Sequence, residues 1–302
     1  MDQPHLLGLL SDQLAAAIRG HGVSIRDAEA RRILAHVIGS GRPGYPTKSP
    51  VPRRVERAID EHLGRAPLEL LETAPDPTDG FVRYLFRSPD GALSEAVRIP
   101  LAREGRFSVC LSSQVGCSMG CAFCATGRLG FQRNLAAWEM VSAFCAVRDD
   151  TPGRVTGAVF MGQGEPLLNT GEVIQAARVL SDPCGGRIRA EGITVSTVGI
   201  VPQIRRYTAE GHRYRLAISL TSTDPLRREE MLPGVARWPV EELADAVRDH
   251  ARSTGDRVTV AWVVLGGVNT GDDEVEGLRR LFDGVNLRFD LIDVNDPRPD
   301  GF

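Results

Sequence analysis

Six short apolar runs alternate with helical segments from Phe107 onward, and this alternation constrains the fold more than any other feature of the chain. The runs span residues 107–112, 156–162, 192–197, 215–220, 258–265 and 288–294, and the helical segments span 135–147, 170–180, 201–211, 239–255 and 272–282. Strands that alternate with helices predict βαβ units and a parallel sheet. The sequence therefore predicts an α/β fold, a partial (β/α)6 TIM-like barrel, with its chemistry at the carboxyl ends of the strands.

The chain before this alternation has a different pattern. Residues 1–72 have apolar positions at helical spacing and predict a helical accessory segment. Residues 73–106 contain two strand-like runs around a Ser-Pro-Asp-Gly turn, which predicts a β-hairpin extension. We therefore expect three parts: a helical accessory segment at 1–72, a hairpin at 73–106 and the barrel domain at 107–302.

The composition of the chain indicates the cellular environment of the protein but not any reaction that it catalyses. The chain has 302 residues and a formal net charge of −3, so bulk charge gives no argument for nucleic acid, although a local patch could still bind it. The N-terminal residues lack the features of a signal peptide, and no apolar run is long enough to span a bilayer. We expect a cytoplasmic protein that does not contact a membrane. In that compartment clustered cysteines more often bind metal than form disulfides.

Three cysteines, Cys117, Cys121 and Cys124, lie close together after the first predicted strand of the barrel domain. A C-x3-C-x2-C loop suits a four-iron cluster, which usually has four thiolate ligands, and a missing fourth thiolate leaves one iron open to a cofactor. The alternative is structural zinc with Cys110 as the fourth ligand. Structural zinc sites usually join two short-spaced pairs, and here there is only one C-x2-C, so the spacing favours iron–sulfur.

This cysteine spacing after the first strand of an α/β barrel is the hallmark of the radical S-adenosylmethionine (SAM) enzymes. The stretch CLSSQVGCSMGCAFCATGRLGFQRNL closely resembles the RlmN/Cfr family within that superfamily, as do FMGQGEPLLN, ITVSTVGIVP, LAISL and LRREEMLPG. The likeness covers roughly residues 80–296. It implies a [4Fe–4S] cluster on the three cysteines, SAM bound at the open iron, and cleavage of SAM to a 5′-deoxyadenosyl radical. It also implies methylation of an adenine carbon in ribosomal or transfer RNA.

Polar residues near the strand ends are candidates for holding SAM. A carboxylate in a Gly-Glu-Pro turn can accept hydrogen bonds from an ammonium group. A lone turn of this kind is nevertheless more often plain surface, and strand-end hydroxyls more often cap helices. The resemblance implies cofactor contacts at Gly164, Glu165, Ser196, Ser219, Leu220, Thr221 and Asn295, with Glu165 on the methionyl amine. Thr221 departs from the family, which has histidine there.

Two further positions are candidates for catalysis. Strand alternation places Glu95 on one face with apolar neighbours, where a carboxylate is costly unless it is paired or functional. A solvent-facing edge strand explains the same pattern. Cys110 lies on a predicted strand, where a lone cysteine is most often a small core residue. The resemblance implies that Glu95 is a general base and that Cys110 takes a proton from the reaction adduct and resolves it through a disulfide.

Two departures from the family leave alternatives open. Family members carry a methyl-accepting cysteine beyond the sixth strand, and the printed sequence stops at Phe302 before any such segment. Either the native chain continues past that residue, or the protein does not methylate by that route. The first 70 residues also match the family poorly. The alternatives are a radical SAM enzyme of specialised metabolism, acting on a small molecule or peptide without a methyl-cysteine intermediate, and a non-catalytic zinc-stabilised RNA-binding protein.

The favoured hypothesis also defines the partners. We expect a monomer whose substrate is ribosomal or transfer RNA, or an adenine-like small molecule. Since SAM cleavage needs one electron, we expect an electron donor such as flavodoxin or ferredoxin.

Overall fold

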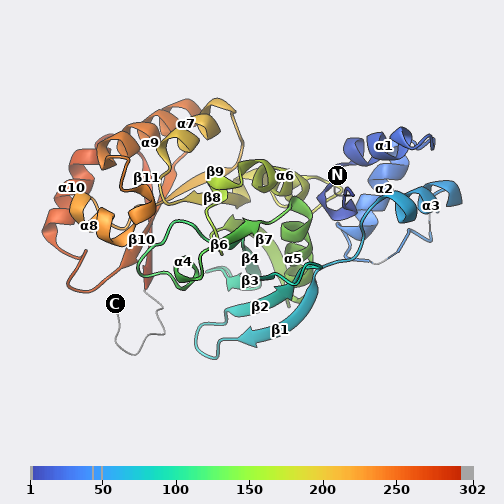
Figure 1. Ribbon diagram of the computed structural model, residues 1–302, viewed down its shortest axis with the longest axis horizontal. Helices are drawn as coiled ribbons and strands as arrows, with labels where there is room; N and C mark the ends of the chain where they lie inside the picture. Colours follow the sequence, from blue (N-terminus) through green and yellow to red (C-terminus); the bar gives the residue numbers. More distant parts are fainter. Residues whose placement is uncertain (1–2, 43, 49, 294–302) are drawn as a thin grey trace. The chain divides into compact units, whose positions relative to one another are not determined.

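The computed structural model describes residues 3–42, 44–48 and 50–293 (Figure 1). The chain divides into two compact units, each of which is built from more than one stretch of sequence. Unit 1 comprises Met1–Ser113, Leu135–Gly162 and Thr170–Ile193, and unit 2 comprises Gln114–Asn134, Gln163–Asn169 and Thr194–Phe302.

The larger sheet has nine strands in the order β1-β2-β3-β4-β7-β8-β9-β10-β11. Its strands are β1 (Glu69–Pro75), β2 (Val82–Arg87), β3 (Leu93–Pro100), β4 (Arg106–Leu111), β7 (Arg154–Phe160), β8 (Ile193–Thr197), β9 (Arg215–Ser219), β10 (Val258–Val264) and β11 (Leu287–Asp293). The six predicted strands correspond to β4 and β7–β11, and they follow one another in chain order. Pairing is parallel for β4–β7, β8–β9, β9–β10 and β10–β11. The predicted α/β fold with a parallel sheet is confirmed.

Helices connect the parallel strands as the periodicity predicted. They are α5 (Ala137–Asp150), α6 (Thr170–Ser181), α7 (Val201–Ala209), α9 (Val240–Thr254) and α10 (Asp272–Phe282). Helix α9 illustrates the signals: it begins after Pro239 and ends at Gly255, whose φ of 70° suits a residue without a side chain. Within unit 2, Figure 1 shows α7 and α9 packed side by side. Unit 2 also contains α8 (Pro225–Met231), a helix that the apolar periodicity did not predict.

Unit 1 contains the predicted accessory helices and hairpin. Helices α1 (Ser11–Gly20), α2 (Asp27–Val37) and α3 (Arg53–His62) surround a core in which Leu14, Ile33 and Ile59 are fully buried. Strands β2 and β3 form the antiparallel hairpin. Strand β1, which was not predicted, adds to β2. Its residues are mostly exposed on both faces, so it lacks the alternation by which a half-buried strand is recognised.

The smaller elements complete the description. A two-stranded sheet pairs β5 (Gln114–Gly116) with β6 (Phe131–Asn134). Helix α4 (Ala125–Leu129) lies between these two strands in the sequence. The described residues also form 3-10 turns at η1 (Leu6–Gly8), η2 (Pro166–Leu168), η3 (Ala190–Gly192) and η4 (Pro233–Val235). Among the described residues, no helix is both long and apolar enough to cross a membrane.

Candidate active site

The cysteine loop is enclosed by the β5–β6 hairpin. Gly116 ends β5 with φ 72°, and a Cβ atom there would lie 1.8 Å from the Gly130 carbonyl oxygen, so only glycine fits. The next residue, Cys117, donates its N–H to that same carbonyl at 3.0 Å. At the other end of the loop, Cys124 is the N-cap of α4 and donates its N–H to the Cys121 carbonyl at 3.0 Å. The three cysteines therefore lie on one short segment whose ends are fixed.

Two of the three thiols have raised pKa values. Burial first, and then negative charge on Cys124, Cys117 and Glu165, raises the pKa of Cys121 to about 12. Burial likewise raises the pKa of Cys117, with Glu165 and Cys124 adding to the shift. Without a bound metal these two thiols hold their protons at neutral pH. Binding iron would displace those protons, as it does for any thiolate ligand.

The environment of the loop is apolar. Cys121 is 9% exposed in a cluster with Met119, Ile200, Met231, Leu232, Val235 and Leu265, and Cys117, Phe123 and Cys124 pack against that cluster. Within the described part of the chain, no three His, Cys, Asp or Glu side chains surround a single point as one metal ion requires. A cubane cluster distributes its thiolates over different iron atoms, so three soft donors in an apolar pocket fit it better than they fit zinc.

Glu165 is buried beside the cysteine loop and held there by backbone amides. Gly164, which precedes it, has φ 96°, and a Cβ there would lie 2.5 Å from the Gln114 side chain. The Glu165 carboxylate is 1% exposed and accepts N–H bonds from Leu167 and Val198, both at 2.9 Å. Burial outweighs these bonds and raises the pKa of Glu165 to about 7. Among the described residues no cationic side chain pairs with the Glu165 carboxylate, which suits an incoming cation.

Hydroxyl groups at the ends of β8 and β9 face each other. Ser196 lies on β8 and Ser219 ends β9, and their Oγ atoms are 3.5 Å apart. Leu220 continues from β9 and donates its N–H to the Ala261 carbonyl at 3.1 Å. The structure thus brings together the strand-end positions that the sequence predicted.

Thr221 has a strained backbone at the same strand end. Its φ is 61°, a conformation that β-branched residues rarely adopt and that costs about 1–3 kcal/mol. The residue is fully buried, and its Oγ1 atom has no hydrogen-bond partner in the described part of the chain. The Asn269 side chain holds it in place by donating to the Thr221 carbonyl at 2.7 Å. A strained residue with an unpaired buried hydroxyl is typical of a ligand-binding position.

The sequence did not predict that Glu274 supports this strand end. Glu274 lies on α10 and is 2% exposed. Its carboxylate accepts both the N–H and the Oγ1–H of Thr223 at 2.6 Å, and it also accepts the hydroxyl of Ser222. Arg227 neutralises it at 2.9 Å. The signal available in the sequence was weak, because an acidic residue in the first turn of a helix usually serves only the helix dipole.

The two predicted catalytic residues, Glu95 and Cys110, both lie in unit 1. Cys110 on β4 pairs with Val97 on β3, so the Cys110 and Glu95 side chains project from the same face of the sheet at diagonal positions. Glu95 is half-buried, at 34% side-chain exposure, and its Oε1 lies 3.8 Å from Nη1 of Arg83. The edge-strand explanation of Glu95 is wrong, because β3 pairs with both β2 and β4. Burial raises the pKa of Cys110 to about 11. Asn295 lies outside the described residues.

The remaining cysteines carry free thiols, as do the four already described. Cys145 lies on α5, where burial raises its pKa to about 11, and Cys184 lies in the loop that follows α6. Neither belongs to the cysteine loop.

Comparison with known proteins agrees with this fold and site. Residues 111–282 match the model of the Radical SAM superfamily, so a radical SAM enzyme is the class that fold and site define. The chain is 49% identical over 295 residues to a probable RNA methyltransferase of Anaeromyxobacter sp., covering 97% of this chain and 84% of the relative. It is 36% identical over 280 residues to the dual-specificity RNA methyltransferase RlmN of Syntrophobacter fumaroxidans, covering 92% and 80%.

A solved structure gives the same result. The radical SAM methyltransferase from Sphaerobacter thermophilus superimposes with a TM-score of 0.88 at 33% identity, covering 98% of this chain and 86% of that one. This chain belongs to the RlmN-type methyltransferase family of the radical SAM superfamily. Membership implies a [4Fe–4S] cluster and SAM as cofactors, and it sets aside the non-catalytic zinc-protein alternative.

The buried carboxylate predicts a pH effect on the cluster-free protein. Because the folded pKa of Glu165 is about 7 and its ordinary value is 4.5, the folded state holds more protons between these values and loses stability as pH rises through them. The loss is about 3 kcal/mol at 1.36 kcal/mol per pKa unit. Thermal melts should show this fall for the wild type but not for Glu165→Gln. The control variant Glu191→Gln, at an exposed site, should behave as the wild type. If the melting temperatures of the wild type and Glu165→Gln change with pH in the same way, Glu165 is not the group with the raised pKa.

Proposed function

We propose that this enzyme methylates an sp2 carbon of adenine in RNA through a 5′-deoxyadenosyl radical. The observation that carries the proposal is the convergence of the thiols of Cys117, Cys121 and Cys124 beside the carboxylate of Glu165. When bound, the cluster supplies one electron for the cleavage of SAM. The names of the relatives, which are RNA methyltransferases, support RNA as the substrate.

In this proposal the strand ends of unit 2 hold SAM. Glu165 accepts hydrogen bonds from the methionyl ammonium group, which provides the countercharge that the buried carboxylate lacks. The hydroxyls of Ser196 and Ser219, with the Leu220–Thr221 step, bind the carboxylate or ribose of SAM. The unpaired Oγ1 of Thr221 is a natural donor for such a contact. Gly164 and Asn295 belong to the same proposed set.

Glu95 and Cys110 supply the proton chemistry on the substrate adenine. Glu95 acts as general base, and its partly exposed position on the sheet leaves its carboxylate accessible. Cys110 removes a proton from the adduct. Its pKa near 11 means that the resting thiol is protonated, so it must lose its own proton first, which a base on the same face of the sheet can accept.

The test combines two measurements on anaerobically reconstituted protein. With deuteromethyl SAM and RNA, nucleoside mass spectrometry should detect labelled adenosine whose label lies on the base carbon framework. Intact-mass measurement of the protein in the same experiment reports whether the chain accepts a methyl group. Formation of 5′-deoxyadenosine with no labelled adenosine in any RNA would reject this proposal and favour a small-molecule or peptide substrate of specialised metabolism.

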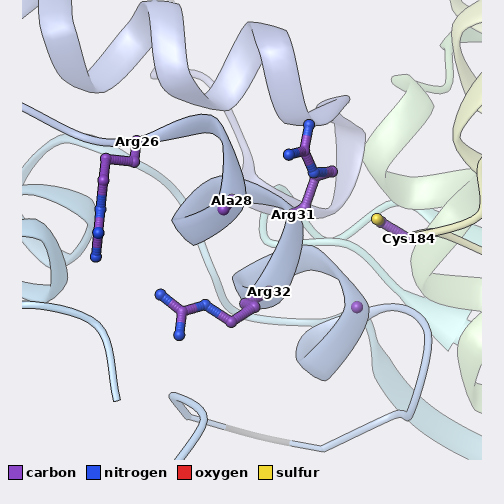
Figure 2. A pocket seen from close by; sticks show the side chains of 6 residues that line it. Arg26, Ala28, Arg31, Arg32 and Cys184 are labelled. Atoms are coloured by element: carbon purple, nitrogen blue, oxygen red, sulfur yellow. The ribbon is translucent and has the colours of Figure 1, made fainter. Parts of the chain in front are cut away.

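An arginine-lined hollow in unit 1 offers a place for RNA phosphates. The hollow of about 640 Å³ is bordered by Arg26, which immediately precedes α2, by Ala28, Arg31, Arg32 and Ala35 of α2, and by Cys184. Figure 2 shows this hollow from close by. Arg26 is paired with Glu29 at 2.6 Å. In the part of the chain that the structure describes, Arg31 and Arg32 form no ion pair, and the Nε of Arg32 is buried without a partner. Unpaired guanidinium groups are suited to phosphate.

The double substitution Arg31→Glu/Arg32→Glu should weaken RNA binding without changing SAM cleavage. Loss of two phosphate contacts on a single strand reduces the slope of log K against log salt by about 1.4. Filter binding across a salt series measures both the affinity and the slope. The matched control Arg103→Glu/Arg189→Glu removes the same charge from exposed positions of unit 1 away from the hollow. Equal losses for both double variants would show a nonspecific charge effect only.

A further inference from the structure

The segment LRREEMLPG, residues 226–234, forms hydrogen bonds with the backbone of the cysteine loop. It comprises nearly all of α8 and the start of η4. The Met231 carbonyl accepts the N–H of Ala122 at 3.0 Å, and the N–H of Gly234 donates to the Met119 carbonyl at 3.1 Å. A Cβ at Gly234 would lie 2.7 Å from that same Met119 oxygen. These two bonds lie on either side of Cys121 and fix its backbone.

Arg228, from the same segment, is a buried cation. It is 4% exposed, and its Nη1 donates to the Leu220 carbonyl at 2.6 Å. Among the residues that the structure describes, this is the one hydrogen bond of its side chain, and the side chain forms no ion pair. A buried charge is costly unless it is paired. Arg228 is therefore a buried cation without a carboxylate partner among the described residues.

The charges nearest to Arg228 point to the missing partner. Burial lowers the pKa of Arg228 to about 10, and negative charge on Cys121 and then on Glu274 opposes the shift. The Glu274 carboxylate is already engaged by Arg227, Ser222 and Thr223. Cys121, by contrast, sits in an apolar cluster that weakens solvent screening. Cys121 is therefore the remaining partner on this side of Arg228, and it becomes negatively charged when its thiol gives up its proton to bind a metal.

We propose that Arg228 is a positioning residue whose buried charge stabilises the reduced state of the cluster held by Cys117, Cys121 and Cys124. The proposal rests on the cluster site proposed above. It gives the LRREEMLPG segment a functional role. Through its bond to the Leu220 carbonyl, the same side chain also links the cysteine loop to the strand end that is proposed to hold SAM.

The redox consequence follows from charge balance. Reduction places one electron on the cluster, taken from a one-electron donor such as a flavodoxin or dithionite, and neither forms nor breaks a bond. Each reduction adds one negative charge beside Arg228. A fixed positive charge in a poorly screened environment favours the more negative state, so its removal must shift the reduction potential to more negative values.

The experiment is a redox titration of the reconstituted protein with SAM absent, monitored by electron paramagnetic resonance. Arg228→Met and Arg228→Gln remove the charge, and glutamine retains a donor for the Leu220 carbonyl. Arg228→Lys retains the charge. Arg206→Met, which removes an exposed arginine paired with Glu210 on α7, is the matched control. We expect the neutral variants to be at least tenfold less reduced at a given potential, which is 59 mV for a one-electron couple. Lysine and the control should stay near wild type.

The pattern across the variants decides between charge and structure. The proposal is supported if both neutral variants have more negative reduction potentials than the wild type and Arg228→Lys does not. If Arg228→Met fails to fold, the comparison of Arg228→Gln with Arg228→Lys suffices. If only the Arg228→Met variant differs from the wild type in reduction potential, the hydrogen bond to Leu220 matters and the charge does not. That result would overturn the proposal. Equal potentials for all variants would overturn it as well. A wild-type protein that binds no four-iron cluster would instead refute the proposed site itself.

Discussion

Cys121→Ala is expected to abolish cluster binding and SAM cleavage together. The site offers three thiols, and Cys121 is the most deeply placed of them, between the backbone bonds that Met119 and Ala122 form with the α8–η4 segment. Alanine can pack in the same apolar cluster, so the fold should survive while one iron loses its ligand. Anaerobic reconstitution should then give a protein with little iron, no brown colour and no detectable 5′-deoxyadenosine.

Cys184→Ala is the matched control, because it removes a partly buried thiol of unit 1 that does not belong to the cysteine loop. It should retain iron and cleavage at wild-type levels. Circular dichroism and melting temperature establish that both variants are folded. A Cys121→Ala protein that still cleaved SAM would overturn the assignment of the cysteine loop. The same experiment on Cys117→Ala and Cys124→Ala should give the same loss.

The parallel sheet and the cysteine loop could be predicted from local patterns in the sequence, whereas the proposed SAM contacts followed from the resemblance to the family. Apolar runs mark the strands, and parallel strands bring their carboxyl ends to one edge. Glu165, Ser196 and Ser219 each occur at such an end, so their clustering followed from topology. The cysteine loop was recognised from spacing alone. Its enclosure by β5 and β6 was not predicted, because these strands are short and pair across α4.

The missed features depend on contacts between distant residues. The strained conformation of Thr221 opposes its own propensity and is maintained by Asn269, which lies 48 positions along the chain. Arg228 belongs to a helix in which charged residues predominate, so its sequence resembles a solvated surface. Its burial is evident only once the Leu220 carbonyl is known to lie within reach. Long-range contacts override local preference most strongly at this site, as expected where function requires strain.

Cys110→Ala is expected to leave the cluster and SAM cleavage intact while turnover falls by about 10²–10⁴-fold, the usual contribution of a positioned acid–base group. Cys110 lies on β4, away from the cysteine loop in sequence, and shares its sheet face with Glu95. Without the thiol, the proton on the adduct has no acceptor. Labelled methyladenosine should therefore accumulate in the RNA more slowly by the same factor, while 5′-deoxyadenosine still forms.

Cys145→Ala provides the control for Cys110→Ala, because burial raises the pKa of both thiols to about 11. If buried thiols mattered only for packing in unit 1, the two variants would lose similar stability and both would turn over normally. We expect Cys145→Ala to turn over as the wild type, whereas Cys110→Ala should stall. Normal turnover by Cys110→Ala would make that residue an ordinary part of the core, and loss of iron in the same variant would make its role structural. The proton-transfer role predicts neither outcome, because it requires cleavage to persist while turnover falls.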